Sequence, residues 1–314
     1  MQTVLDVLQM ALPVAMLIGI GQICRTTKLM SEASIDGCKA LISNILIPIM
    51  LFDLMAGLEL SGEMVWIVVI SLAMNAAAFG LGFLLKKLTR EQSRYFPYLM
   101  AGFEVGLLGL ALFPLIFGQD SLGYLATMDL GNCLFFCFLM LPSMQAMDAG
   151  AGEKKSLKQT LKTVFTTPPL IGCLLGLLCN LTGLIGLLQG SALAPVYDAC
   201  AELGTRGLTP LILIVVGWGM SFNKGILGKV IKTCVLRAVS LSLVCLMALG
   251  LFRLAGITDP LATYSVIMMC AVSAPYVCSV YAKDVREREY INTQLSMHVF
   301  VTIIVFIVLS IVAR

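Results

Sequence analysis

Long apolar runs, separated by short polar segments, follow one another along almost the whole chain. Each run covers at least about 20 residues, which is enough for a helix to cross the roughly 30 Å hydrocarbon layer of a membrane. The runs are continuous, whereas a strand of a membrane barrel alternates apolar and polar positions. The pattern predicts ten transmembrane helices, near residues 4–24, 34–58, 64–85, 95–117, 122–146, 168–188, 191–222, 228–256, 260–282 and 289–313.

The composition agrees with an all-α polytopic membrane protein. Of the 314 residues, 59% are hydrophobic and 12% are charged, whereas a soluble domain carries about 25% charged residues. The net charge of +3 comes from the predicted loops and needs no nucleic-acid partner. The first apolar run lacks a basic leader and a small-residue cleavage site, so we expect it to stay in the mature protein.

Basic residues in the loops predict the orientation, because short loops rich in Lys and Arg favour the cytoplasm. The first, third, fifth, seventh and ninth loops carry most of them, and Lys39, Arg206 and Arg237 lie within or beside the helices. Both termini are therefore expected outside, in a multi-pass protein of the plasma membrane or bacterial inner membrane. The loop residues are Arg25, Lys28, Lys86, Lys87, Arg90, Arg94, Lys154, Lys155, Lys158, Lys162, Lys224, Lys229, Lys232, Lys283, Arg286 and Arg288.

Cysteine and histidine are not arranged as metal ligands. The eleven cysteines lie almost entirely inside the apolar runs, without short paired spacings, and His298 is the single histidine of the chain. Disulfide frameworks and zinc sites need clustered ligands. We therefore expect buried thiols, no metal and no cofactor.

The chain divides into two similar halves. The only long polar break, residues 148–167, separates a first five-helix repeat (1–147) from a second (168–314), and we expect a short cytoplasmic amphipathic helix within this linker. Pro13 and Pro168 mark the first helix of each half, and Pro48 and Pro210 mark the second. Because five is odd, similar halves must be inverted in the membrane, as in many secondary transporters.

The fourth and ninth helices are expected to be broken. The fourth contains Gly102, Glu104, Gly106 and Gly109, and the ninth contains Pro275, which removes a helical hydrogen bond. Free backbone groups at this depth are tolerated only if they are packed in protein or line a polar cavity. We therefore predict a substrate site at the breaks, formed by Gly106, Gly109, Ser273, Pro275 and Tyr276.

Glu104 is the strongest candidate for ion coupling, since an ionisable residue inside a membrane is costly and usually functional. It can bind Na⁺ when ionised or carry a proton when neutral. The alternative is a structural carboxylate paired with a buried arginine or a backbone amide. Asp129 and Asn132, one helical turn apart in the fifth helix, and Thr293 and Ser296 in the tenth are further ion-coupling candidates.

Several short motifs together resemble the auxin efflux carrier family, which includes plant auxin exporters and bacterial permeases for malate, malonate and related acids. The resemblance covers essentially the whole chain and adds Asn44 to the substrate-site candidates. Its motifs are Asn44 to Phe52, the glycine-rich fourth helix ending at Phe117-Gly118, Pro168 to Gly172, Ala274-Pro275, and Thr293 to Ser296.

The resemblance implies a particular architecture. Helices 1, 2, 6 and 7 would form a scaffold that holds a homodimer, and helices 3–5 and 8–10 would form a moving transport domain. Broken helices 4 and 9 would cross at the substrate site, and the motion would be elevator-like. The more distant bile-acid sodium symporters look similar and place cations beside this crossing.

One departure from the family pattern bears on the substrate. Where the family usually has an asparagine followed by Gly-x-Pro, this chain has Glu104 and then Gly109-Leu110-Ala111. An ionised Glu104 repels an anion unless it is protonated or paired. The substitution therefore favours a coupling ion at Glu104, and equally fits a neutral or cationic substrate.

These observations lead to one function and several alternatives. We expect a secondary transporter of small organic anions, driven by protons or Na⁺ and in contact with the lipid bilayer. The alternatives are a carrier of a neutral or cationic solute and a membrane sensor of the same fold. A channel would need a filter sequence or ring of charges, and an enzyme would need a catalytic constellation that is not apparent. We expect no enzymatic activity.

Overall fold

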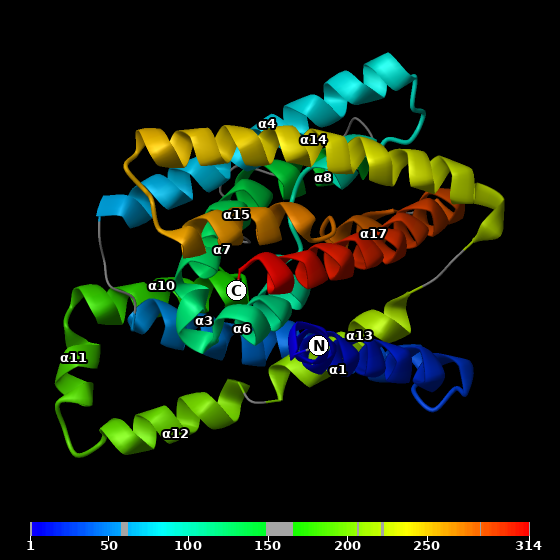
Figure 1. Ribbon diagram of the computed structural model, residues 1–314. Coiled ribbons are helices and arrows are strands. Elements are labelled where there is room, and N and C mark those ends of the chain that lie inside the picture. The colour runs from blue at the N-terminus through cyan, green and yellow to red at the C-terminus, as the bar shows by residue number, and fades with distance from the viewer. Residues whose placement is uncertain are drawn as a thin grey trace.

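The computed structural model describes residues 2–57, 62–148, 166–205, 207–220, 223–282 and 284–313. In these residues every regular element is a helix. Figure 1 shows the helices in two groups, one around α1 and α13 and the other around α4, α14 and α17. The expected amphipathic helix of the linker lies outside the described residues.

The first group contains segments from the start of each half. We call it the lower group, after its place in Figure 1. Helix α1 packs on α13, and α10 packs on α3. The members are α1 (Gln2–Thr26), α2 (Glu32–Leu41), η1 (Ile42–Leu46), α3 (Ile47–Ala56), α10 (Pro168–Leu181), α11 (Leu184–Gln189), α12 (Ala194–Thr205) and α13 (Leu208–Gly219).

The second, upper group holds the remaining helices. Helix α4 packs on α5, α7 and α14, and α14 also packs on α15 and α17. The members are α4 (Gly62–Thr89), α5 (Phe96–Met100), η2 (Val105–Gly109), α6 (Leu110–Phe117), η3 (Gln119–Ser121), α7 (Leu122–Phe135), η4 (Phe136–Met140), α8 (Leu141–Asp148), η5 (Lys224–Ile226), α14 (Leu227–Leu254), α15 (Pro260–Ala271), α16 (Val277–Tyr281) and α17 (Val285–Val312).

Glycines allow the close contacts of the lower group. A Cβ atom on Gly217 of α13 would overlap the Ile18 carbonyl oxygen of α1, and one on Gly172 of α10 would overlap the Pro48 carbonyl oxygen of α3. Small residues let membrane helices approach until their backbones touch. The glycines of Pro168 to Gly176 therefore fix the α10–α3 contact.

The described part of the chain is all-helical, and its apolar helices make this a multi-pass membrane protein. Among the described residues, six segments are long and apolar enough to cross a membrane: Glu32–Ala56, Gly62–Thr89, Leu122–Met144, Ala194–Gly219, Leu227–Leu254 and Val285–Val312. Leu12–Thr26, Pro168–Leu181 and Pro260–Ala271 are shorter apolar helices. The predicted fourth and ninth spans do not form continuous helices, because each is interrupted within the span.

The two interruptions are the central feature of the upper group. Helix α5 ends at Met100 and regular structure resumes at Val105, while α15 ends at Ala271 and α16 begins at Val277. Gly102 has a φ of +68°, a conformation that glycine adopts at little cost. We call residues 101–104 and 272–276 together the double break.

Candidate functional site

The two halves of the double break are hydrogen-bonded to each other. The N–H of Glu104 donates to the Ser273 carbonyl at 2.9 Å. The N–H of Tyr276 donates to the Glu104 carboxylate, also at 2.9 Å. A Cβ on Gly102 would come within 2.8 Å of the Pro275 ring. The glycine of one break and the proline of the other are therefore in direct contact.

A cavity of about 380 Å³ opens beside the double break, between the lower and upper groups. The upper group contributes most of its wall, and the lower group supplies residues from η1, α3 and the start of α10. The lining residues are Ser43, Ile47, Leu51, Phe103, Glu104, Gly106, Asp129, Asn132, Cys133, Phe136, Pro169, Pro275 and Val277. We call this space the central cavity.

Three π-helical turns border the central cavity. Ser43 lies in η1, Gly106 in η2 and Phe136 in η4, and each lines the cavity. A π-helical turn inserts an extra residue into a helix and often occurs at a functional site. Because all three turns in the described residues reach one cavity, their placement supports this region as the functional site.

Asn132 fixes the backbone of the first break. Its side-chain oxygen accepts from the Phe103 N–H at 3.2 Å, and its amide donates to the Phe103 carbonyl at 2.8 Å. The same amide donates to the Asp129 carboxylate at 2.9 Å. Asn132 thereby connects the backbone just before Glu104 to the second carboxylate of the cavity.

The structure brings five of the predicted site residues together. Glu104, Gly106, Asp129, Asn132 and Pro275 all line the central cavity. The apolar pattern of the fifth helix does not show which way Asp129 faces. In the structure Asp129 faces the same cavity as Glu104. Glu104 also has one of the two structural partners anticipated for it, a backbone amide.

The other predicted residues lie nearby without lining the cavity. Ser273 and Tyr276 belong to the double break and contact Glu104 through their backbones. Gly109 is buried next to Val105 and Leu125. Asn44 is exposed in η1.

Thr293 and Ser296 are occupied within their own helix. The Thr293 hydroxyl donates to the Glu289 carbonyl, and the Ser296 hydroxyl donates to the Asn292 carbonyl. Both residues lie on α17 and do not line the central cavity.

The aromatic part of the cavity wall and a buried cation were not predicted from the sequence. Phe103 and Phe136 line the cavity, but a phenylalanine within an apolar run carries no signal of its own. Arg237 is fully buried in α14 and donates to carbonyls of both breaks. Its isolated charge in the middle of an apolar run is the signal that identifies it.

The ionisable side chains that line the central cavity are acidic. Two carboxylates line it, whereas none of the described lining residues is Lys, Arg or His. Among the described residues, no group of three or more His, Cys, Asp or Glu side chains is placed to hold a metal ion. The two carboxylates favour a proton, a cation or a cationic group, and oppose an unaccompanied anion.

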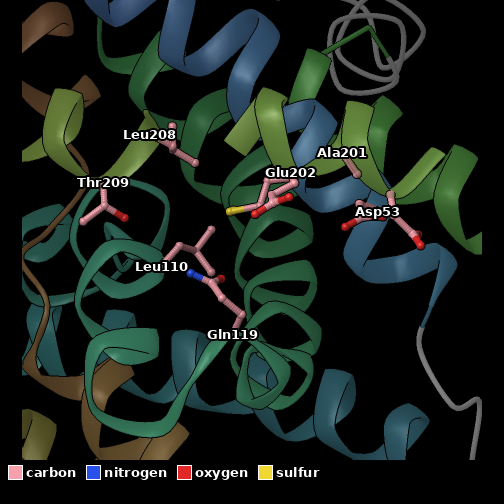
Figure 2. Close-up of a pocket in the computed structure, with 9 residues that line it drawn as sticks. Asp53, Leu110, Gln119, Ala201, Glu202, Leu208 and Thr209 are labelled. Atoms are coloured by element: carbon pink, nitrogen blue, oxygen red, sulfur yellow. The ribbon is translucent and has the colours of Figure 1, made fainter. Parts of the chain in front are cut away.

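A second cavity of about 510 Å³ lies further along the boundary between the two groups. Figure 2 shows Asp53, Ala201 and Glu202 on one side of it and Leu110 and Gln119 on the other. The Tyr197 hydroxyl donates to Asp53 at 2.7 Å. Arg206, which is four residues from Glu202 and is a possible ion-pair partner by spacing, is outside the described residues.

A scan of protein-family models finds no match to this sequence, and a search of curated proteins finds no relative.

Proposed function

We propose that this protein is a secondary active transporter of small organic solutes, with its substrate site in the central cavity and Glu104 as the coupling residue. One observation carries the proposal: a cavity at the contact of two interrupted membrane helices contains two carboxylates from the same helix group. Interrupted helices with a site at their meeting point are typical of secondary transporters.

The solute that we propose first is a small carboxylic acid, as the family resemblance implies. An anion of this kind would share the cavity with Glu104 and Asp129, and none of the described lining residues is basic. Binding therefore requires that protons or Na⁺ neutralise the carboxylates. In this proposal the need for neutralisation couples movement of the acid to an ion gradient.

A cationic solute is the second candidate, favoured by the same acidic side chains. An organic ammonium group would pair directly with Glu104 or Asp129, and Phe103 and Phe136 would supply aromatic contacts for it. Such a solute would compete with Na⁺ or protons for the carboxylates. An organic acid would need these ions instead.

We also propose that the ten predicted spans form two inverted repeats of five helices. The pairing of helices supports this arrangement, because exchange of the two halves converts the α1–α13 contact into the α10–α3 contact. The hydrogen bonds around the breaks support it too. Asn132 in the fifth span holds Phe103 within one break, and Thr302 in the tenth span donates to the Ala271 carbonyl directly before the other.

In this proposal the lower group is the scaffold and the upper group is the transport domain. The central cavity lies on the boundary between them, so an elevator-like movement would carry its carboxylates across the membrane. The proposal includes a homodimer held by the scaffold, in a plasma or bacterial inner membrane, with both termini outside. It includes no cofactor and no enzymatic activity.

Thermal stabilisation of the purified protein tests the function. Small carboxylates and small ammonium compounds are added with and without Na⁺, at acid and neutral pH, to wild type and Glu104→Gln. An acid carrier is stabilised by a carboxylate only with Na⁺ or at low pH, and Glu104→Gln loses that dependence. Glu202→Gln is the matched control, since Glu202 lines the second cavity.

Counterflow of the stabilising solute in liposomes then separates transport from sensing. A labelled solute that exchanges across the membrane supports a carrier. Stabilisation without exchange points to a ligand-binding sensor. If no acid stabilises the protein under any condition while an ammonium compound does, the cationic candidate replaces the acid.

A further inference from the structure

Arg237 lies on α14 and contacts both segments of the double break without lining the central cavity. It is 0% exposed, and none of the described carboxylates forms an ion pair with it. A charged side chain inside a membrane protein is costly, and it usually marks a functional position. A buried arginine usually pairs with a carboxylate, but Arg237 donates to backbone carbonyls.

Backbone carbonyls of both breaks take the place of a carboxylate. One guanidinium nitrogen, Nη1, donates to the Leu99 carbonyl. The other, Nη2, donates to the Gly102 carbonyl at 3.1 Å and to the Val272 carbonyl at 3.2 Å. The guanidinium carbon lies 5.9 Å from the centre of the Phe103 ring. A single side chain therefore binds the two broken segments at once.

These carbonyls need a donor because of where they lie. Leu99 is in the last turn of α5, Gly102 is in the first break, and Val272 directly follows α15. The last carbonyls of a helix have no partner within it, and the C-terminal end of a helix carries partial negative charge. The planar, forked guanidinium can serve several such carbonyls in fixed directions, whereas a lysine ammonium is a compact point charge.

The position of Arg237 also links it to the cavity carboxylates. Gly102, which it binds, is two residues from Glu104, and Val272 directly precedes Ser273, whose carbonyl accepts from the Glu104 N–H. Any change in the relative placement of the two breaks would therefore move Glu104. Glu104 and Asp129 line the central cavity, whereas Arg237 does not.

We propose that Arg237 is the positioning residue of the site: it holds both broken segments as one unit, and its charge weakens the hold of Glu104 and Asp129 on a cation. The first half of this proposal, that Arg237 holds the two broken segments together, concerns geometry and is independent of transport. The second half, that its charge weakens cation binding, rests on the proposed ion coupling.

Hydrogen exchange of the full-length protein in nanodiscs tests the first half. Arg237→Lys keeps the charge but loses the fork, and Arg237→Gln loses the charge but keeps an amide donor. Both variants should exchange several-fold faster in peptides that cover residues 99–108 and 270–280, with α1 and α10 unchanged. Arg253→Gln, at the exposed end of the same helix, is the control. Faster exchange in only one break, or evenly along the chain, would overturn the proposal.

The apparent affinity for Na⁺ or protons, measured by thermal stabilisation, tests the second half. Because like charges repel, removal of the Arg237 charge should tighten cation binding several-fold, once the loss of positioning is accounted for. Both variants lose the planar guanidinium and only Arg237→Gln loses the charge, so Arg237→Gln should bind the cation more tightly than Arg237→Lys. A purely structural role predicts equal affinities in the two variants, and that result would overturn the charge effect. If wild type responds to neither ion, the ion coupling of the proposed function fails, while hydrogen exchange still decides whether Arg237 positions the breaks.

Discussion

Glu104 and Tyr276 are joined across the double break, because the Tyr276 N–H donates to the Glu104 carboxylate at 2.9 Å. The two residues are far apart in sequence and belong to helices that are each interrupted at this point. A carboxylate that accepts a backbone hydrogen bond still has further lone pairs. Glu104 therefore has a structural partner on one side and remains available to the central cavity, which it lines.

Gly102→Ala should open the double break. The Gly102 φ of +68° disfavours a side chain, and a new Cβ would meet the Pro275 ring at 2.8 Å. We expect a loss of stability of about 2–4 kcal/mol, together with loss of solute-dependent thermal stabilisation.

Gly118→Ala is the matched control for this change. Gly118 has a φ of +85°, but a Cβ added there would have no heavy atom within 4 Å. The variant should show only the backbone cost of about 1–3 kcal/mol and keep solute binding. Equal losses in the two variants would mean that the Gly102–Pro275 contact contributes nothing.

Asn132→Leu should lower the stability of the protein more than the same substitution at a second buried asparagine, Asn75. The change leaves the Phe103 N–H and carbonyl without their side-chain partner and also removes the donor to Asp129. Unsatisfied buried groups cost about 1–3 kcal/mol each. Thermal unfolding in detergent measures the effect. The control is Asn75→Leu, a buried residue whose amide donates to the Ser71 carbonyl of its own helix; a larger effect there would contradict the role of Asn132.

The glycines of the lower group allow a paired test. Gly21→Ala in α1 would place a methyl group against the Ile214 carbonyl oxygen of α13, whereas Gly19 in the same helix has no heavy atom within 4 Å. Gly21→Ala should lower stability by about 1–3 kcal/mol, and Gly19→Ala should be neutral or slightly stabilising. Melting curves of the two variants in one detergent give the comparison. A harmless Gly21→Ala would show that α1 and α13 are separated in the membrane.

A loop at one end of the upper group should make stability depend on pH. Burial alone would raise the pKa of Glu91. The Lys229 ammonium at 2.9 Å and the N–H groups of Ser93 and Gln92 together lower it by more, so the net pKa is below its ordinary value of 4.5. The unfolded chain then binds the proton more readily than the folded chain. The stabilisation is complete above about pH 4.5 and is lost as the pH falls through the folded pKa.

Glu91→Gln should therefore lower the melting temperature at pH 7, and the difference from wild type should shrink as the pH falls below about 4.5. Asp36→Asn is the control, because Asp36 and Lys39 form a pair with both side chains largely exposed, which contributes little. A difference for Glu91→Gln that is independent of pH would show that its charge is not the cause.

The sequence was sufficient to predict the helical membrane character, the interruption of two helices and the position of Glu104 at one of the interruptions. Those features follow from length, apolar continuity, glycine, proline and an isolated charge, all of which are local. Continuous helices alone do not give ten crossings. The fourth and ninth segments stop at Met100 and Ala271 before regular structure resumes, and the first and sixth appear as the shorter apolar helices Leu12–Thr26 and Pro168–Leu181.

The missing parts of the site depend on helix rotation and on contacts between distant segments. Thr293 and Ser296 look available in the sequence, but their hydroxyls donate to carbonyls one turn earlier in α17. Phe103 and Phe136 reach the cavity from a break and a π-helical turn. A single-residue shift in the helical register, as in such a turn, changes which side chains face inward, and apolar periodicity does not reveal it.

A larger side chain at Gly106 should separate solute binding from folding. Gly106 lines the central cavity, and an added Cβ would have only Ile47 Cδ1 of the lower group nearby, at 3.4 Å. Gly106→Leu therefore projects into space between the two groups and does not press on backbone. It should abolish solute-dependent stabilisation and counterflow while the melting temperature of the solute-free protein changes little. Gly219→Leu, in α13 where nothing lies within 4 Å, should retain both activities; if Gly106→Leu also retains them, the solute does not occupy this cavity.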